Sequence, residues 1–364
     1  MRIPRRPILA LLLAVMLPAL ACNLPSRARM EARSTPGSLV LATQLAVPTA
    51  TPNVALLPPM ATALAQEHPL FPDSEIVYSP AALSFDAAAF IDSAGGSLRG
   101  YSETGDKEEL SGAQIVQRVA EETSTNPRLL LGLLEYTSGW VYGQPAPGSD
   151  PAYPIGFENP AYRGLDRELR LAVRYLSQGY YAARAGQLGQ IVFPDGVTID
   201  LPADANPAMA ALYSLFARLL PIIDWQNAVL GPEGFISFYT AKVGDPWARA
   251  VEPLLPDGLA QPALDLPIPP GQTWAFTGGP HITWGVGSPP GAIDLAPIAG
   301  TGCKPAPQQA VAAAPGMVVR SARGALALDL DGDGNEQTGW GLVDMHLANR
   351  APAGSRVEDG DPLG

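Results

Sequence analysis

The sequence predicts an α+β multidomain protein, in which a helical N-terminal domain is followed by a mainly antiparallel β-sheet domain. Apolar residues recur at helical spacing in several segments between residues 111 and 220. After a Pro-rich connection over residues 253–270, short segments alternate apolar and polar residues with a period of two. The 364 residues are 47% hydrophobic and 16% charged, a composition typical of a globular protein with two domains and linkers.

Residues 1–22 are predicted to be a signal peptide. Basic residues at the start precede an apolar stretch over residues 8–20, which is too short to span a bilayer comfortably. Small residues directly before Cys22 resemble a bacterial lipoprotein processing site. We therefore expect lipidation of Cys22 and export to the cell envelope, with the protein anchored to the outer face of the membrane. The alternative is cleavage after Ala21 and a freely secreted protein.

Residues 23–74 are predicted to form an extended tether, because Pro, Ala and Thr dominate there and no period is sustained. Residues 75–262 are predicted to form the helical domain. Ser111 and Gln114 have the spacing of a capping box that opens a helix. Asn126 and Pro127 together predict the start of a second helix.

Two further apolar stripes at helical spacing cover residues 165–181 and 208–220. Strands are expected around residues 318 and 325–329, and alternation predicts another over residues 341–347.

Charge and cysteine content exclude two classes of protein. The formal net charge of −12 repels phosphate backbones, so nucleic acid is not an expected partner. Two cysteines in so long a chain exclude a disulfide-stabilised scaffold.

A candidate metal site begins with the segment from Phe276 to His281 and continues to Asp294. Zinc bound for hydrolysis takes three protein ligands, imidazole or carboxylate, and keeps one position open for water. Glycines before His281 allow the backbone to approach a metal closely. A single His and a single Asp are more often structural than metal-binding, so residue types alone leave both readings open.

Several short segments resemble one family of zinc peptidases. Thr277-Gly-Gly-Pro-His281, with Asp294 thirteen positions further on, resembles the metal-binding segment of β-lytic metalloendopeptidases of the lysostaphin/LytM family. Residues 311–319 resemble the strand-turn-strand of that family, residues 344–347 its Tyr-x-His-Leu strand, and residues 357–364 the stretch that follows. The resemblance runs from about residue 274 to the last residue, in the order of the family.

This resemblance implies that residues 263–364 form a β-rich zinc endopeptidase domain. It implies Zn²⁺ as cofactor, His281 and Asp294 as zinc ligands, and His346 as a catalytic histidine that polarises the metal-bound water or stabilises the oxyanion. The implied reaction is hydrolysis of stem or cross-bridge peptides of bacterial peptidoglycan. In such sites zinc lowers the pKa of bound water to about 7.

One motif of the family has no counterpart. Its His-x-His supplies the third zinc ligand and a second catalytic histidine, and the sequence ends at Gly364, before the place where this motif is expected. We expect either a truncated piece of a longer protein or a degenerate domain, and we favour truncation because the family-like order continues to the last residue. The chain as given is then expected to be inactive. The alternative function is a non-catalytic envelope protein that regulates or targets wall hydrolases.

A second candidate cation site lies in a predicted turn. Hard oxygen ligands on alternate residues are suited to Ca²⁺. An EF-hand would need a carboxylate at the position of Trp340, so the segment is not one. The alternative is a solvated acidic turn between two strands. The alternating carboxylates are Asp329, Asp331, Asp333 and Glu336.

The helical domain contains a weaker resemblance. Residues 129–140 resemble the helix of lysozyme-like transglycosylases that carries the catalytic Glu, but Thr137 occupies that position and Glu135 lies two residues earlier. We therefore expect a glycan-binding or spacer module, or simply a packed bundle, rather than a second enzyme. Aromatic residues that are candidates either for sugar stacking or for the core are Tyr136, Trp140, Tyr175, Tyr180 and Tyr181.

Overall fold

The computed structural model describes residues 71–104, 108–145, 147–255, 258, 260–281, 291–298, 304–322 and 324–364. Cys22, the predicted signal peptide and nearly all of the predicted tether lie outside these residues. The described residues form two compact units, a helical unit of residues 71–260 together with 280–281 and 291–292, and a C-terminal unit of residues 261–279 and 293–364. The protein is thus of mixed α+β structure, as predicted. No described helix combines the length and the hydropathy needed to span a bilayer.

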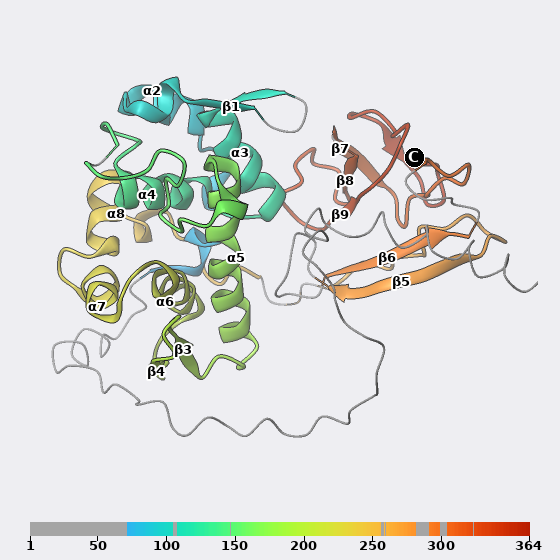
Figure 1. Ribbon diagram of the computed structural model, residues 1–364. Coiled ribbons are helices and arrows are strands. Elements are labelled where there is room, and N and C mark those ends of the chain that lie inside the picture. Colours follow the sequence, from blue (N-terminus) through green and yellow to red (C-terminus); the bar gives the residue numbers. More distant parts are fainter. Residues whose placement is uncertain are drawn as a thin grey trace, which may run out of the picture. The chain divides into compact units, whose positions relative to one another are not determined.

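Seven α-helices form the helical unit among its described residues, and α5 and α6 pack along each other (Figure 1). Short 3-10 segments connect them at residues 73–75, 80–82, 97–100, 160–162 and 247–249. The helices are α2 (Ala87–Ala94), α3 (Gly112–Thr123), α4 (Pro127–Ser138), α5 (Leu165–Arg184), α6 (Pro207–Leu219), α7 (Ile222–Leu230) and α8 (Phe235–Val243).

The predicted helix starts are confirmed. Ser111 Oγ accepts the N–H of Gln114 at 3.3 Å, and the Gln114 side chain accepts the N–H of Ser111 at 2.9 Å, which completes the capping box of α3. Asn126 caps α4 through the N–H of Arg128 at 2.9 Å. α4 ends at Gly139, whose φ of 70° is the left-handed conformation that glycine adopts most readily.

The start of α5 is capped by a residue from elsewhere in the chain. Its N-cap position is Gly164, which has no side chain to offer. The carboxylate of Glu103 instead accepts the N–H groups of Leu165 at 2.8 Å and of Asp166 at 3.1 Å. Glu103 belongs to a small antiparallel hairpin, β1 (Ser102–Thr104) with β2 (Glu109–Ser111). A second hairpin pairs β3 (Gln190–Val192) with β4 (Thr198–Asp200).

The core of the helical unit lies where α5 meets α6. A Cβ atom at Gly179 of α5 would lie 2.6 Å from the carbonyl oxygen of Ala210 and 2.4 Å from Ser214 Oγ, both in α6. The absence of a side chain at Gly179 therefore sets how closely the two helices approach. Tyr180 and Tyr213, 1% exposed each, contribute large rings to this core.

The C-terminal unit contains an antiparallel four-stranded sheet with the order β10-β7-β8-β9 and a separate two-stranded pair, β5-β6. All five residues of β8 are buried, so the alternation expected around residues 325–329 is not found; both faces of this central strand are covered. The strands are β5 (Trp274–His281), β6 (Ala292–Pro297), β7 (Gly316–Ala322), β8 (Ala325–Asp329), β9 (Gly341–Asp344) and β10 (Arg356–Val357).

Candidate metal centre

The two predicted zinc ligands lie on strands that pair with each other. His281 is the last residue of β5, and Asp294 lies in β6. A Cβ atom at Gly278 would lie 2.7 Å from Asp294 Oδ2, so the carboxylate of Asp294 rests against the glycine-rich segment of β5. A side chain at position 278 would have to displace this carboxylate. The side chain of His281 lies outside the described part of the structure.

His346, the predicted catalytic histidine, lies beyond the end of a strand. β9 ends at Asp344, so the strand expected to continue through Leu347 is shorter than predicted. His346 is exposed in a bend with a φ of 63°, which is uncommon for a residue other than glycine. The bend is held because the N–H of Leu347 donates to the carbonyl of Gly324 at 2.9 Å.

Asp344 was not predicted as a site residue, although it stands where the resembled family has an aromatic. Burial raises the pKa of Asp344 to about 6. It pairs with Leu326 of the buried strand β8. An acid that titrates near neutral pH therefore lies two residues from His346. The signal in the sequence was an acidic residue at the end of an otherwise apolar strand.

The described side chains include one group of three metal-binding side chains, and it contains neither Asp294 nor His346. It lies in the acidic turn after β8, where carboxylate oxygens of Asp329, Asp331 and Asp333 are within 4.8 Å of one another. The structure thus brings together three of the four predicted calcium ligands.

Asp329 organises this turn from within. Its carboxylate is fully buried and accepts the backbone N–H groups of Asp331, Gly332 and Gly334 at 3.1, 3.1 and 2.7 Å. Burial opposes ionisation of Asp329, but these bonds and the hydrogen bond with the Asp331 carboxyl outweigh it and hold the pKa of Asp329 below its usual value. The same shared hydrogen bond raises the pKa of Asp331. Two carboxyl groups in this contact favour a shared proton or a cation.

Glu336, the fourth predicted calcium ligand, is not part of this group. Both of its oxygens accept from Arg320 Nε, at 2.9 and 3.1 Å. Arg320 lies in β7, so the ion pair joins the acidic turn to the sheet. The pairing of Glu336 with β7 could not be seen in the linear spacing of the carboxylates.

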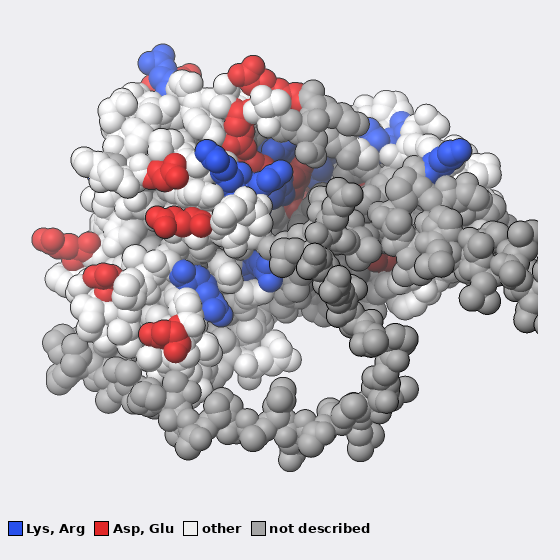
Figure 2. Space-filling model, in the orientation of Figure 1, with Lys and Arg blue, Asp and Glu red and all other residues white. Residues whose placement is uncertain are grey.

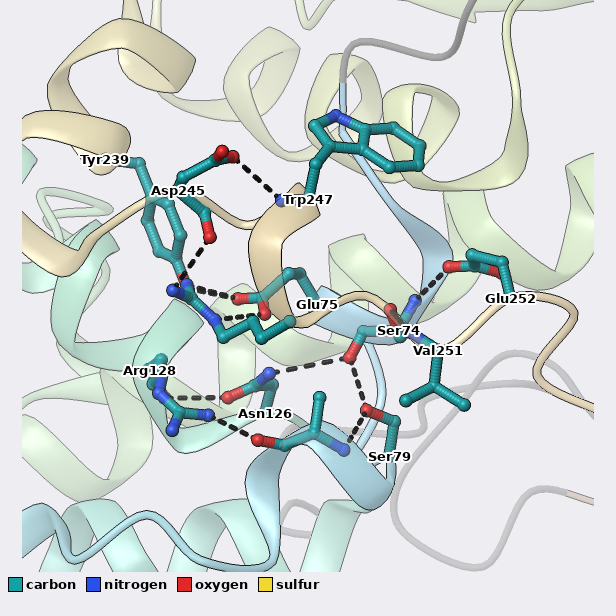
Figure 3. Close-up of polar contacts among 12 residues, drawn as sticks. Ser74, Glu75, Ser79, Asn126, Arg128, Tyr239, Asp245, Trp247, Val251 and Glu252 are labelled. Atoms are coloured by element: carbon teal, nitrogen blue, oxygen red, sulfur yellow. Dashed lines mark hydrogen bonds and ion pairs between the residues drawn. The ribbon is translucent and has the colours of Figure 1, made fainter.

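The helical unit contains a buried polar network that the sequence did not reveal (Figure 3). Glu75 is fully buried, and its carboxylate accepts from Arg249 Nε at 2.7 Å, from Arg249 Nη2 at 3.1 Å and from the Tyr239 hydroxyl at 2.5 Å. Burial and the adjacent Glu75 raise the pKa of Tyr239 well above its usual value, so the hydroxyl remains a donor.

The neighbours of Glu75 connect the same two chain segments. The N–H of Ser74 donates to Glu252 Oε1 at 2.8 Å, and Ser74 Oγ accepts the N–H of Val251 at 3.1 Å (Figure 3). These bonds therefore connect residues 74–75, near the start of the helical unit in the sequence, with residues 249–252, near its end.

The transglycosylase-like segment has no free acid at the position expected for catalysis. Thr137 Oγ1 donates to the carbonyls of Leu133 and Pro154, both at 3.0 Å. Glu135 Oε2 accepts the N–H groups of Val141 at 2.8 Å and Tyr142 at 3.0 Å, so it closes the end of α4. Both side chains have structural partners.

Comparison with known proteins gives one result for the helical unit. The family model described as "LasA, N-terminal domain" matches residues 69–256, just over half of the chain. LasA is a peptidase of the LytM or β-lytic type. The match contains all seven described α-helices. No curated protein and no solved structure matches the chain.

Proposed function

Because the chain belongs to the family that carries the LasA N-terminal domain, we propose that it is an envelope zinc endopeptidase that hydrolyses peptide bonds of bacterial peptidoglycan. The observation that carries the proposal is the agreement of two separate parts of the chain. The family match covers residues 69–256, whereas the motifs that resemble the lysostaphin/LytM family begin only at about residue 274. Neither argument uses the residues of the other.

The residue types on β5, β6 and the bend after β9 are consistent with this chemistry. An imidazole from His281 and a carboxylate from Asp294 are donors that zinc takes in hydrolases, and the paired strands β5 and β6 carry both residues. A bound zinc ion would supply the Lewis acid that polarises the scissile carbonyl and activates water. The exposed position of His346 leaves its imidazole accessible to a substrate, so that it can move a proton or donate to an oxyanion.

Elemental analysis of the purified full-length protein, which is expected to supply the third zinc ligand, tests the zinc assignment without relying on activity. Wild-type protein should contain zinc, and His281→Ala and Asp294→Ala should each lower its content strongly, because each removes one of few ligands. Asp359→Ala is a suitable control, since Asp359 is exposed in the same unit. Release of amines from purified peptidoglycan then reports turnover. Undiminished zinc and turnover in His281→Ala would contradict the assignment.

The second candidate function is a non-catalytic envelope protein that binds peptidoglycan and targets or regulates wall hydrolases. It is favoured because the family match covers residues 69–256 and does not extend to His281, Asp294 or His346. Wild-type protein that sediments with peptidoglycan sacculi, yet contains no zinc and releases no amines, would support this function over the first.

Two further assignments belong to the proposal. Lipidation of Cys22 would hold the protein at the outer face of the membrane, and labelling with a palmitate analogue tests it, since a Cys22→Ser variant should lose the label. Ca²⁺ is the proposed occupant of the acidic turn, where carboxylate oxygens of Asp329, Asp331 and Asp333 lie within 4.8 Å of one another.

A further inference from the structure

A positively charged surface lies along α5 in an otherwise acidic protein. The whole chain carries 23 Lys and Arg against 35 Asp and Glu, but residues 163–184 carry five arginines and only two carboxylates. Of these carboxylates, Glu168 is fully buried, and Asp166 is engaged by Arg118 and Arg170. Both carboxylates of the segment thus have partners, and the one further carboxylate described at the start of α5, that of Glu103, accepts the N–H groups of Leu165 and Asp166. Lys and Arg side chains gather over α5 in Figure 2.

Two cations of α5, the exposed Arg167 and the partly exposed Arg174, share one face of the helix. Arg167 and Arg174 are seven residues apart, which places them on the same face of the helix about 10 Å from each other. Arg163 precedes the helix and is exposed, as is Arg167, and neither forms an ion pair with a described residue. Arg170 differs from them because it pairs with Glu122 of α3.

Partly exposed aromatic rings lie among these cations. The guanidinium of Arg218, an exposed residue of α6, lies 5.5 Å from the ring centroid of Tyr175. Tyr175 also contacts Phe157, with the ring centroids 5.6 Å apart. Arg174 Nη1 lies 3.5 Å from the Tyr162 hydroxyl. We call these seven residues the α5 surface: Phe157, Tyr162, Arg163, Arg167, Arg174, Tyr175 and Arg218.

The structure also separates this surface from the other candidate sugar-stacking residues. Trp140 is 3% exposed and Tyr180 1% exposed, so both belong to the core. Tyr136 packs edge-to-face on Phe216 and Phe235. Tyr175 and Tyr181 are both partly exposed, but Tyr181 packs edge-to-face on the buried Tyr180, whereas Tyr175 has the guanidinium of Arg218 over its ring.

The arrangement indicates the chemistry of a partner. Arginine forks match phosphate and carboxylate oxygens, and the faces of aromatic rings suit the apolar faces of sugars. Two cations about 10 Å apart along a helix cannot both contact one small anion, so a partner that contacts both must carry several charges. A polymer with a phosphate in each repeat presents anionic groups at regular intervals, which suits cations placed along a helix.

We propose that the α5 surface binds a phosphate-bearing glycopolymer of the bacterial cell wall, and thereby holds the protein at the wall; this rests on the proposed location of the protein in the cell envelope. This site is distinct from the zinc site and does not require the protein to be a peptidase. Its failure would leave the peptidase proposal untouched, because zinc content and turnover are measured separately.

Binding of the full chain to an immobilised glycosylated poly(ribitol phosphate) tests the proposal. Arg163→Glu/Arg167→Glu should weaken binding at least about tenfold, since two attractive contacts become repulsive. The matched control is Arg99→Glu/Lys242→Glu, which makes the same charge change at exposed residues away from α5 and should change the affinity by less than about threefold. Both variants must keep the wild-type circular dichroism spectrum. If Arg163→Glu/Arg167→Glu does not fold, the neutral variant Arg163→Gln/Arg167→Gln is used in its place and should also bind more weakly than the wild type.

A gain of affinity provides the complementary test. Glu158 is exposed and follows Phe157, so Glu158→Gln removes an anion next to the surface and should strengthen binding. Equal losses in the two charge-reversed variants, or no binding by the wild type, would overturn the proposal. Equal affinity for sugar-free polyphosphate would also overturn it, because the rings would then contribute nothing. Tighter binding to phosphatidylglycerol vesicles would overturn it as well, because it would indicate a membrane partner.

Discussion

Removal of the Glu75 carboxylate should destabilise the helical unit far more than removal of a surface ion pair. Glu75 is fully buried, whereas 20% of the Arg249 side chain is exposed, so Glu75→Ala leaves a largely buried guanidinium and the Tyr239 hydroxyl without their acceptor. Breaking a buried pair in this way costs about 3 to 5 kcal/mol. That is a large part of the total stability of a domain, which is about 5 to 15 kcal/mol.

Urea unfolding followed by the helical circular dichroism signal measures this loss. With a slope of about 2 kcal/mol per molar urea, the midpoint of Glu75→Ala should fall by about 2 M. Asp92→Ala is the control, because its pair with Arg99 is 66% and 61% exposed and should contribute under about 1 kcal/mol. The double variant Glu75→Met/Arg249→Met should recover most of the loss, since it leaves no unpaired charge. Equal midpoints for Glu75→Ala and Asp92→Ala, or a double variant worse than either single one, would refute the reasoning.

Three other predictions concern both units. The pKa of Asp344 is raised from 3.8 to about 6 by burial, so the folded state prefers the protonated acid. The stability that this group contributes is fully present below about pH 4 and is lost as the pH rises through about 6. Asp344→Asn should remove this loss of stability, which is at most about 3 kcal/mol. Urea unfolding midpoints of the wild type and the variant, compared at pH 4 and 7.5, measure it. An unchanged pH dependence in the variant would contradict the burial argument. Calorimetry with millimolar Ca²⁺ should give heat for the wild type and much less for Asp331→Asn, whereas no wild-type heat would exclude calcium in the acidic turn. Gly179→Ala should lower the thermal midpoint of the helical signal by the equivalent of about 1 to 3 kcal/mol, because its methyl group would meet α6; a neutral effect would mean that the two helices can move apart.

Local signals in the sequence were sufficient for several elements of the helical unit. The capping box at Ser111 and the Asn126-Pro127 pair fix helix starts through contacts within four residues, so the linear sequence contains all the information needed. Apolar spacing likewise located α5 and α6. The helices α2, α7 and α8, and both small hairpins, were not predicted, because they are short and their burial depends on neighbours distant in sequence.

The sequence also predicted the candidate site only in part. Alternating carboxylates suggested a four-residue cation site, yet Glu336 pairs with Arg320 of β7, a choice that depends on sheet register. The period-two pattern predicted a strand through His346, but β9 ends at Asp344 and the chain bends. The arginine spacing on α5 was readable in the sequence, whereas its exposure and its contacts with Tyr175 and Tyr162 were not.

The sequence by itself thus determined the helix caps, the change from helical to strand periodicity, and the order of motifs that resemble a zinc peptidase, because each depends on residues close together in the chain. Only the tertiary structure decided which charged groups are buried and which partners they have. Glu75 and Arg249 are 174 residues apart, and Glu103 caps a helix that begins 62 residues later. Such contacts depend on packing that brings distant segments together, where burial makes an unpaired charge costly and so selects the partner.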